Sequence, residues 1–335
     1  MGINDYSVSS FLVLGLSTAL YFHFHGRRDK GEKKDVHRKN NNVQRYQIVG
    51  DRLSTLPQHI QRHLHKALLL NQVGGSRSNL EDIREKSFRF IKSVHIEQEG
   101  SYLQNNGRWV SFHGNQEITT NPASPGFIFD EDVKLLGDSP FFNRLEIHVR
   151  DTFIDGKSDV SVDFMKIFPI VSHADISTMN EGHLEQWMAN IPLYPTSFIY
   201  QSDGLLVWSD QESLSFIQNG KITDKLPSSY PEYPKVVARI TEPNSADTAE
   251  VEYTFDDNGL IVAASGVLHP EKRNYPTEQG EESVRIWERR FLDYQVHDGL
   301  LVPTKIEFGW WDKKMQIFHV NVRLSITKIV YIFEE

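Results

Sequence analysis

Regularly spaced turn signals constrain the fold of this chain more than any other feature of its sequence. Six Asn-Gly or Asp-Gly pairs lie between residues 106 and 299. Such pairs accept the positive φ angles of tight hairpin turns. So many hairpin signals are hard to reconcile with a helical or an α/β fold, and they predict antiparallel strands. The pairs are Asn106-Gly107, Asp155-Gly156, Asp203-Gly204, Asn219-Gly220, Asn258-Gly259 and Asp298-Gly299.

Apolar and polar residues alternate between these turns, as expected for strands with one face in water. Residues 145–150 and 318–326 are examples of this period-two pattern. Two segments have helical spacing instead, one beginning near Ser54 and one at 181–190, which Pro192 terminates. We therefore expect an α+β fold: a large curved antiparallel sheet, like a half-barrel, with one or two packing helices.

An uncharged, mostly apolar segment precedes this region, at residues 8–24. As a helix, its 17 residues span about 25 Å, close to the roughly 30 Å of a bilayer core. The basic flank that follows would stay in the cytosol. We expect residues 1–25 to be a single-pass membrane anchor, 26–53 a polar basic linker and 54–335 a cytosolic β-rich domain. A cleaved targeting peptide to an organelle, or a buried or interfacial helix, is the alternative.

Composition excludes several kinds of chemistry. The chain has no cysteine, so disulfides, thiolate catalysis and cysteine-ligated metals are ruled out. Its net charge is −9; residues 1–50 hold 8 Lys/Arg against 4 Asp/Glu, or +4, which leaves −13 for the remainder. So acidic a body disfavours nucleic acid as a partner. His59 and His63 have metal-ligand spacing but no evident third ligand, and no phosphate loop is present, so no metal and no cofactor are expected.

Asp151 is the first candidate for a functional residue. It follows Leu145, Ile147 and Val149 on the apolar parity of a predicted strand, so its carboxylate is expected to point inward. A buried carboxylate needs a partner and often marks a site. The candidates for this partner are Arg150, Arg289 and Arg290, or the side chain opens into a cavity. Asp151 and Asp155 are the catalytic candidates, and the plain alternative is an aspartate that leaves a strand for a turn.

A second set of residues has the character of a ligand site. Trp287, Arg289 and Phe291 share one face of a predicted strand, and an arginine among aromatic rings can hold an anionic head group above an apolar cavity. A cross-strand salt bridge is the alternative. The predicted ligand-binding residues are Arg150, Trp208, Trp287, Arg289 and Trp310.

The order of short sequence motifs along the chain also resembles that of a known protein family. The chain contains LPQHIQRHLHKAL, Pro125-Gly126-Phe127, RDTFIDGKSD, HLEQWMANIPLYPTSF and FDDNGLI, and then Trp287, Tyr294, Asp298-Gly299, Pro303 and Trp310. In this it resembles a mainly bacterial family of uncharacterised proteins, over roughly residues 54–330. The resemblance implies no activity, and where family members tend to carry an acidic residue this chain has Asn190. By strand pattern alone, the chain is similar to the half-barrels of lipoprotein carriers.

The sequence alone is compatible with three functions. The first is a membrane-tethered binding protein for a hydrophobic or amphipathic small molecule of the lipid or isoprenoid class. The second is an enzyme or accessory protein of lipid or specialised-metabolite biosynthesis that uses Asp151 or Asp155. The third is a scaffold that places partner enzymes at a membrane. An apolar cavity into which Asp151 opens would distinguish the first two from the third.

Overall fold

The computed structural model describes residues 52–68, 90–104, 106–134, 145–174, 177–200, 205–209, 216–218, 221–223, 226–268, 285–312 and 316–334. The predicted N-terminal helix and almost all of the predicted linker lie outside these residues. Within them, no helix is both long and apolar enough to cross a membrane. The predicted anchor therefore stays a prediction.

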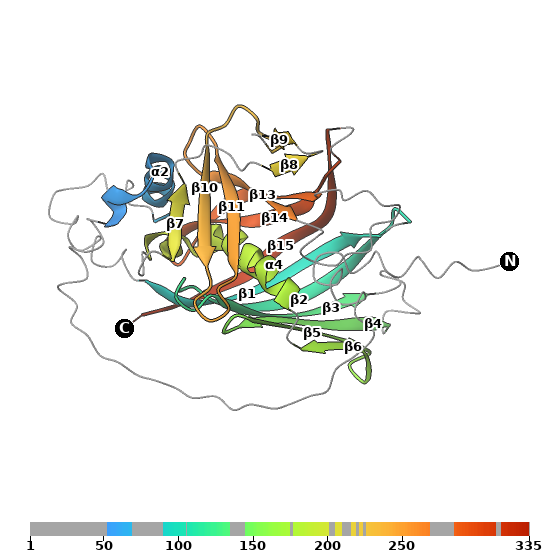
Figure 1. Cartoon of the computed structure of the whole chain (residues 1–335). Coiled ribbons are helices and arrows are strands. Elements are labelled where there is room, and N and C mark those ends of the chain that lie inside the picture. Colours follow the sequence, from blue (N-terminus) through green and yellow to red (C-terminus); the bar gives the residue numbers. More distant parts are fainter. Residues whose placement is uncertain are drawn as a thin grey trace.

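A single antiparallel sheet of thirteen strands dominates the described part of the chain, as expected from the alternating sequence (Figure 1). Its strand order is β6-β5-β4-β3-β2-β1-β15-β14-β13-β12-β11-β10-β7, so the first and last strands of the chain's β-rich region meet at β1 and β15. The strands are β1 (Ile91–Leu103), β2 (Trp109–Thr119), β3 (Gly126–Lys134), β4 (Glu146–Ile154), β5 (Lys157–Phe164), β6 (Phe168–Ala174), β7 (Leu206–Ser209), β10 (Lys235–Thr241), β11 (Thr248–Phe255), β12 (Ile261–Leu268), β13 (Arg285–His297), β14 (Leu300–Asp312) and β15 (Ile317–Phe333). A separate hairpin pairs β8 (Phe216–Gln218) with β9 (Lys221–Thr223).

Hairpin turns occur where the sequence predicts them. Four of the six turn dipeptides fall in described loops, joining β1 to β2, β4 to β5, β11 to β12 and β13 to β14. Their glycines, at positions 107, 156, 259 and 299, have φ angles between 73° and 82°, which a residue with a side chain adopts only under strain. The pairs at 203–204 and 219–220 lie outside the described residues.

The sheet curves strongly around one helix, α4 (Ser177–Ala189) (Figure 1). This helix packs against β3, β4 and β5 on one side and against β11 and β12 on the other, although these groups are far apart in the strand order. Irregular pairing along β1–β15, β14–β15 and β11–β12 marks bulges, which bend and twist strands locally. The predicted helix at 181–190 is confirmed, and it begins four residues earlier.

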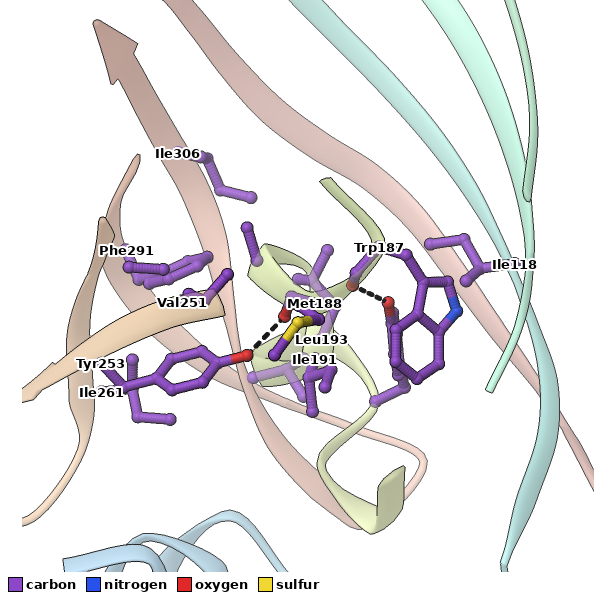
Figure 2. Close-up of a cluster of buried hydrophobic side chains, with 14 of the residues drawn as sticks. Ile118, Trp187, Met188, Ile191, Leu193, Val251, Tyr253, Ile261, Phe291 and Ile306 are labelled. Carbon is purple, nitrogen blue, oxygen red and sulfur yellow. Dashed lines mark hydrogen bonds between the residues drawn. The ribbon is translucent and has the colours of Figure 1, made fainter. Parts of the chain in front are cut away.

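Because α4 lies within the curve of the sheet, most of its described residues are buried, including those of its last turn. Trp187 and Met188 occupy its last turn, where carbonyl groups lack partners within the helix. The hydroxyl of Tyr194 donates to the carbonyl of Trp187 at 2.5 Å, and that of Tyr253 on β11 donates to the carbonyl of Met188 at 2.7 Å (Figure 2). Buried tyrosines thus terminate the helix and bind it to the sheet.

The chain continues from α4 through two short 3₁₀ helices, η3 (Ile191–Leu193) and η4 (Pro195–Ile199). Their prolines stop the α-helix as the sequence predicts. Tyr331 on β15 donates its hydroxyl to the carbonyl of Leu193 at 2.8 Å, and Ser197 donates to the carbonyl of Thr120 at 2.6 Å. The segment after α4 is therefore fixed to the middle of the sheet.

The first predicted helix is α2 (Gln58–Ala67), with Pro57 immediately before it. It packs against β14 and η4, and its His63 is fully buried between Phe198 and Phe255. The backbone N–H of Ile261 donates to Nδ1 of His63 at 3.3 Å, and burial lowers the pKa of this imidazole to about 3. His63 is thus a neutral acceptor in the core of the domain.

Candidate functional site

A cavity of about 160 Å³ lies between α4 and the concave face of the sheet. Side chains from β1 to β4 form one wall, and side chains from β13 to β15 form the other. Aromatic and polar side chains share its surface, and most of the aromatic ones occupy inward positions on the apolar parity of their strands. The rings that line it belong to Tyr102, Phe112, Phe129, Trp287, Phe308 and Trp310.

One face of α4 closes the cavity on the side opposite the sheet. The residues on this face recur within three or four positions of one another, the spacing that places side chains on one side of a helix. Most of them are polar or small, so the helix leaves room where a run of leucines would fill the space. They are Met179, Gly182, His183, Glu185, Gln186 and Ala189, with Asn190 directly after the helix.

Asp151 lies on the β4 wall of the cavity with 1% of its surface exposed. Its Oδ1 is 3.0 Å from Nε2 of His183, and Nδ1 of that histidine is 2.8 Å from the hydroxyl oxygen of Ser158. The imidazole of His183 is close to the carboxylate of Asp151, but its orientation does not suit a hydrogen bond. Neither carboxylate oxygen therefore has a hydrogen bond within the described residues. The inward orientation agrees with the sequence parity, and the neighbour is a histidine instead of an arginine.

A second buried carboxylate lies beside this wall. Glu131 on β3 is 1% exposed, and the hydroxyl of Tyr102 donates to its Oε2 at 2.5 Å. The pKa of Glu131 is raised to about 8, mainly by burial; the hydrogen bond from Tyr102 opposes this effect, and the nearby charges of Asp151 and Asp132 add to it. At neutral pH this side chain is therefore mainly a neutral acid.

The opposite wall carries a positive charge on Arg289. Its guanidinium donates a hydrogen bond to Oδ1 of Asn190 at the end of α4 and lies 5.8 Å from the ring centre of Phe308. Burial lowers the pKa of Arg289 to about 10, so the group remains charged at neutral pH. Beside it, Nε1 of Trp287 donates to Oε2 of Glu185 at 3.2 Å, which orients that indole along the wall.

The structure brings together four of the residues singled out in the sequence. Asp151, Trp287, Arg289 and Trp310 all line the cavity, and they come from β4, β13 and β14. Cross-strand pairing accounts for part of this arrangement, since Trp287 is opposite Trp310 in the β13–β14 register. The chemistry they offer is an aromatic surface with an acidic and a basic pole.

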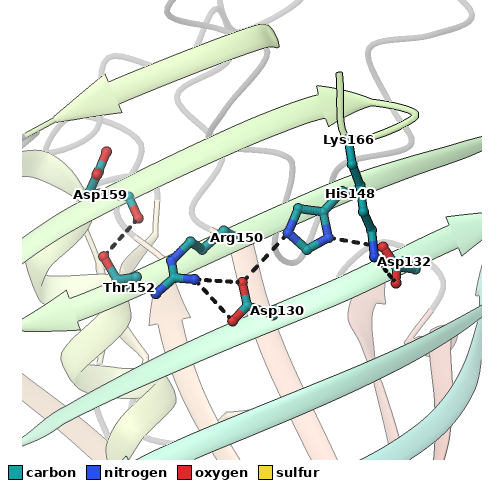
Figure 3. Close-up of polar contacts among 7 residues, drawn as sticks. All are labelled: Asp130, Asp132, His148, Arg150, Thr152, Asp159 and Lys166. Carbon is teal, nitrogen blue, oxygen red and sulfur yellow. Dashed lines mark hydrogen bonds and ion pairs between the residues drawn. The ribbon is translucent and has the colours of Figure 1, made fainter. Parts of the chain in front are cut away.

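Three other candidates lie elsewhere. Arg150 points to the outer face of the sheet, where its NH1 is 3.2 Å from Oδ1 of Asp130 in a row of charged side chains (Figure 3). Asp155 is exposed in the β4–β5 turn with a φ of 52°. Trp208 on β7 packs against Phe198, with ring centres 5.5 Å apart, and is not among the residues that line the cavity.

The types of residue around Asp151 include those of a serine hydrolase, but their order differs. In such enzymes the serine oxygen faces the substrate and the aspartate lies behind the histidine. Here Asp151 faces the cavity, while Ser158 is 1% exposed and lies behind His183. Within the described ranges, no cluster of three His, Asp or Glu side chains is placed to hold a metal ion. The arrangement suits binding or proton transfer by a carboxylate.

The part of the chain that forms the first wall of this cavity matches the model of a known family. Residues 54–216 match the model of DUF6920, a family of unknown function. The resemblance to an uncharacterised family is thereby confirmed over this range. The DUF6920 match includes Asp151 and His183, whereas Arg289 and Trp310 lie beyond it. A search of curated proteins finds no match.

Several solved structures are similar to this chain at low identity and low TM-score. A putative outer membrane lipoprotein-sorting protein domain from Vibrio parahaemolyticus is 8% identical, with a TM-score of 0.35, over 71% of this chain and 85% of that one. The LolA superfamily protein NE2245 from Nitrosomonas europaea is 11% identical, with a TM-score of 0.36, over 73% and 88%. A DUF1329 family protein from Desulfovibrio piger is 9% identical, with a TM-score of 0.34, over 82% and 94%. Because these TM-scores are below 0.5, function is inferred only from the residues of this chain.

Sequence reasoning missed His183, Asn190 and Glu131. The signal for Glu131 was available, because it follows Phe127 and Phe129 on the inward parity of β3, as Asp151 does on β4. The two α4 residues are seven apart and so share a face, but only the curvature of the sheet reveals that this face borders a cavity.

Replacing Glu131 by Gln should change how stability depends on pH. The folded pKa of about 8 lies above the ordinary value of 4.5, so the folded chain retains a proton that the unfolded chain releases. Stability from this group is complete below pH 4.5 and is lost as the pH rises through 8. Between pH 5 and pH 8, wild type should lose roughly 3 kcal/mol of unfolding free energy relative to Glu131→Gln, measured by urea denaturation.

Glu117→Gln is the matched control, since Glu117 is 70% exposed on the neighbouring strand β2. Its pH profile should parallel that of wild type. If the Glu131→Gln profile is also parallel to wild type, Glu131 is ionised in the folded protein and this description of the acidic wall is wrong.

Proposed function

We propose that this protein is a membrane-tethered binding protein for a hydrophobic or amphipathic small molecule of the lipid or isoprenoid class. The observation that carries the proposal is the aromatic cavity between α4 and the sheet, with Asp151 on one wall and Arg289 on the other. Small-molecule sites are typically apolar hollows with a few polar groups that fix the orientation of the ligand.

The unsatisfied polar groups around the cavity indicate that it is a ligand site and not a packing defect. Protein interiors are close-packed, and buried polar atoms almost always have partners. In the described residues, both oxygens of Asp151, Nε of Arg289 and Nε1 of Trp310 have no hydrogen-bond partner in the protein. These atoms have almost no accessible surface, but their side chains all border the same space, so a ligand or water molecules there would satisfy them once the side chains shift slightly.

A second candidate function is an enzyme or biosynthetic accessory protein that uses Asp151 for acid–base work. The contact of Asp151 with His183, which Ser158 in turn holds, favours this alternative over one that uses Asp155 in its exposed turn. A carboxylate beside an imidazole at the wall of a cavity is suitably placed to transfer a proton to a bound molecule. The scaffold alternative has no comparable observation in its favour.

Filling the cavity should remove the ligand. Val322 on β15 lies opposite both Tyr102 and Phe308 in the sheet and points into the cavity. We expect Val322→Trp to occupy the space with its indole. The full chain would be purified, extracted with organic solvent and analysed by mass spectrometry for co-purifying amphipathic molecules. Wild type should carry such a molecule and Val322→Trp should have lost most of it, about tenfold or more.

Val330→Trp is the control, because Val330 is the same residue type on the same strand but is 39% exposed on the outer face. This variant should retain the molecule at the wild-type level. Absence of any amphipathic molecule from all three proteins, or equal amounts in all three, would contradict the proposed function.

The tether is proposed from the sequence of residues 8–24 and the basic flank that follows. We expect the full chain to remain in the membrane pellet after alkaline washing, with the β-rich domain accessible to protease from the cytosolic side. Deletion of residues 1–26 should move the protein to the soluble fraction with its circular dichroism spectrum intact. A full-length chain in the soluble fraction, or a mature protein that begins near residue 26, would contradict the tether.

A further inference from the structure

Arg289 has a charge that the protein does not neutralise. Its guanidinium donates to the neutral amide of Asn190 and lies over the ring of Phe308, and none of the carboxylates in the described residues is at ion-pair distance from it. Arg289 is partly buried, and a partly buried charge without a counter-ion is still destabilising. Since the side chain borders the cavity, a bound anion is in a position to supply the missing charge.

Unused hydrogen-bond donors lie on the same wall. Nε of Arg289 and Nε1 of Trp310 are both buried and without partners in the protein. The ring of Phe308 connects them, since it lies 5.8 Å from the guanidinium and 5.7 Å from the indole of Trp310. This wall therefore carries a cation beside one aromatic ring, together with two unpartnered N–H groups that neighbouring atoms cover.

The remainder of the cavity limits the kind of anion. Apart from Arg289, the charged residues that border it are Asp151, Glu185 and Arg285, so a dianionic phosphate would meet a net negative charge there. A monoanionic, planar carboxylate matches the planar guanidinium and carries less charge into this space. The rings of Phe112 and Trp287 provide an apolar surface for the rest of such a ligand.

We propose that the cavity binds an aliphatic carboxylic acid, with its carboxylate at the guanidinium of Arg289 and its hydrocarbon chain against Phe112, Trp287 and Phe308. This inference rests on the proposed function and adds the chemistry of the head group. It assigns Arg289 as the residue that selects the ligand by charge.

The test compares ligands that share a chain and differ in the head group. Octanoate, octanol and octyl phosphate would be titrated calorimetrically into the full chain in phosphatidylcholine nanodiscs, with empty nanodiscs subtracted. Wild type should bind octanoate about tenfold more tightly than octanol and more tightly than octyl phosphate. This comparison needs no variant, so it decides the proposal even if substitutions at Arg289 prevent folding.

Arg289→Gln removes the charge and should bind octanoate and octanol with affinities within about twofold of each other. Arg150→Gln is the control, because Arg150 is a partly exposed arginine on the outer face of the same sheet. The Arg150→Gln variant should prefer octanoate to the same degree as wild type. Unchanged melting temperatures would establish that the Arg289→Gln effect is local.

The outcomes separate this inference from the proposed function. If wild type binds octanol as tightly as octanoate, the carboxylate assignment is overturned and the apolar binding function stands. If octyl phosphate binds most tightly, a phosphate head group replaces the carboxylate. If none of the three ligands binds, both the inference and the proposed function are overturned. A persistent preference for octanoate in Arg289→Gln would overturn the role of Arg289.

Discussion

Burial of α4 inside the curved sheet is the constraint on which the rest of this structure depends. A helix enclosed in this way must find partners for the carbonyl groups of its last turn away from water. Tyr194 and Tyr253 provide them through hydroxyl hydrogen bonds to the carbonyls of Trp187 and Met188. The sheet then bends around the helix, and the cavity is the part of the interior that the small and polar face of α4 leaves unfilled.

The two walls of the cavity come from opposite halves of the chain. The acidic wall is built from β3, β4 and α4, and the basic wall from β13 and β14, which join the first half through the pairing of β1 with β15. An amphipathic ligand would therefore contact both halves at once. The match to DUF6920 ends at residue 216, so the basic pole represented by Arg289 belongs to the part of the chain beyond that match.

The sequence predicted the antiparallel sheet, both helices and the inward orientation of Asp151, because hairpin turns, helix stops and residue parity are local properties. It also placed Trp287 and Arg289 on one face. It did not predict that His183 would lie against Asp151, or that Asn190 would bind Arg289, since these contacts depend on how far the sheet curves. Arg150 is next to Asp151 in sequence but on the other face of the strand, so strand parity already disfavoured it as a cavity residue.

The central claim is that the space between α4 and the sheet is a ligand site. Crystals of the protein grown with a bromine-tagged long-chain alcohol, which has no charge and so does not need Arg289, would test this directly through anomalous scattering. We predict a bromine peak inside the cavity, among Phe112, Trp287 and Phe308. Bromine only on the outer surface of the protein, or a cavity filled by a rearranged α4, would contradict the account.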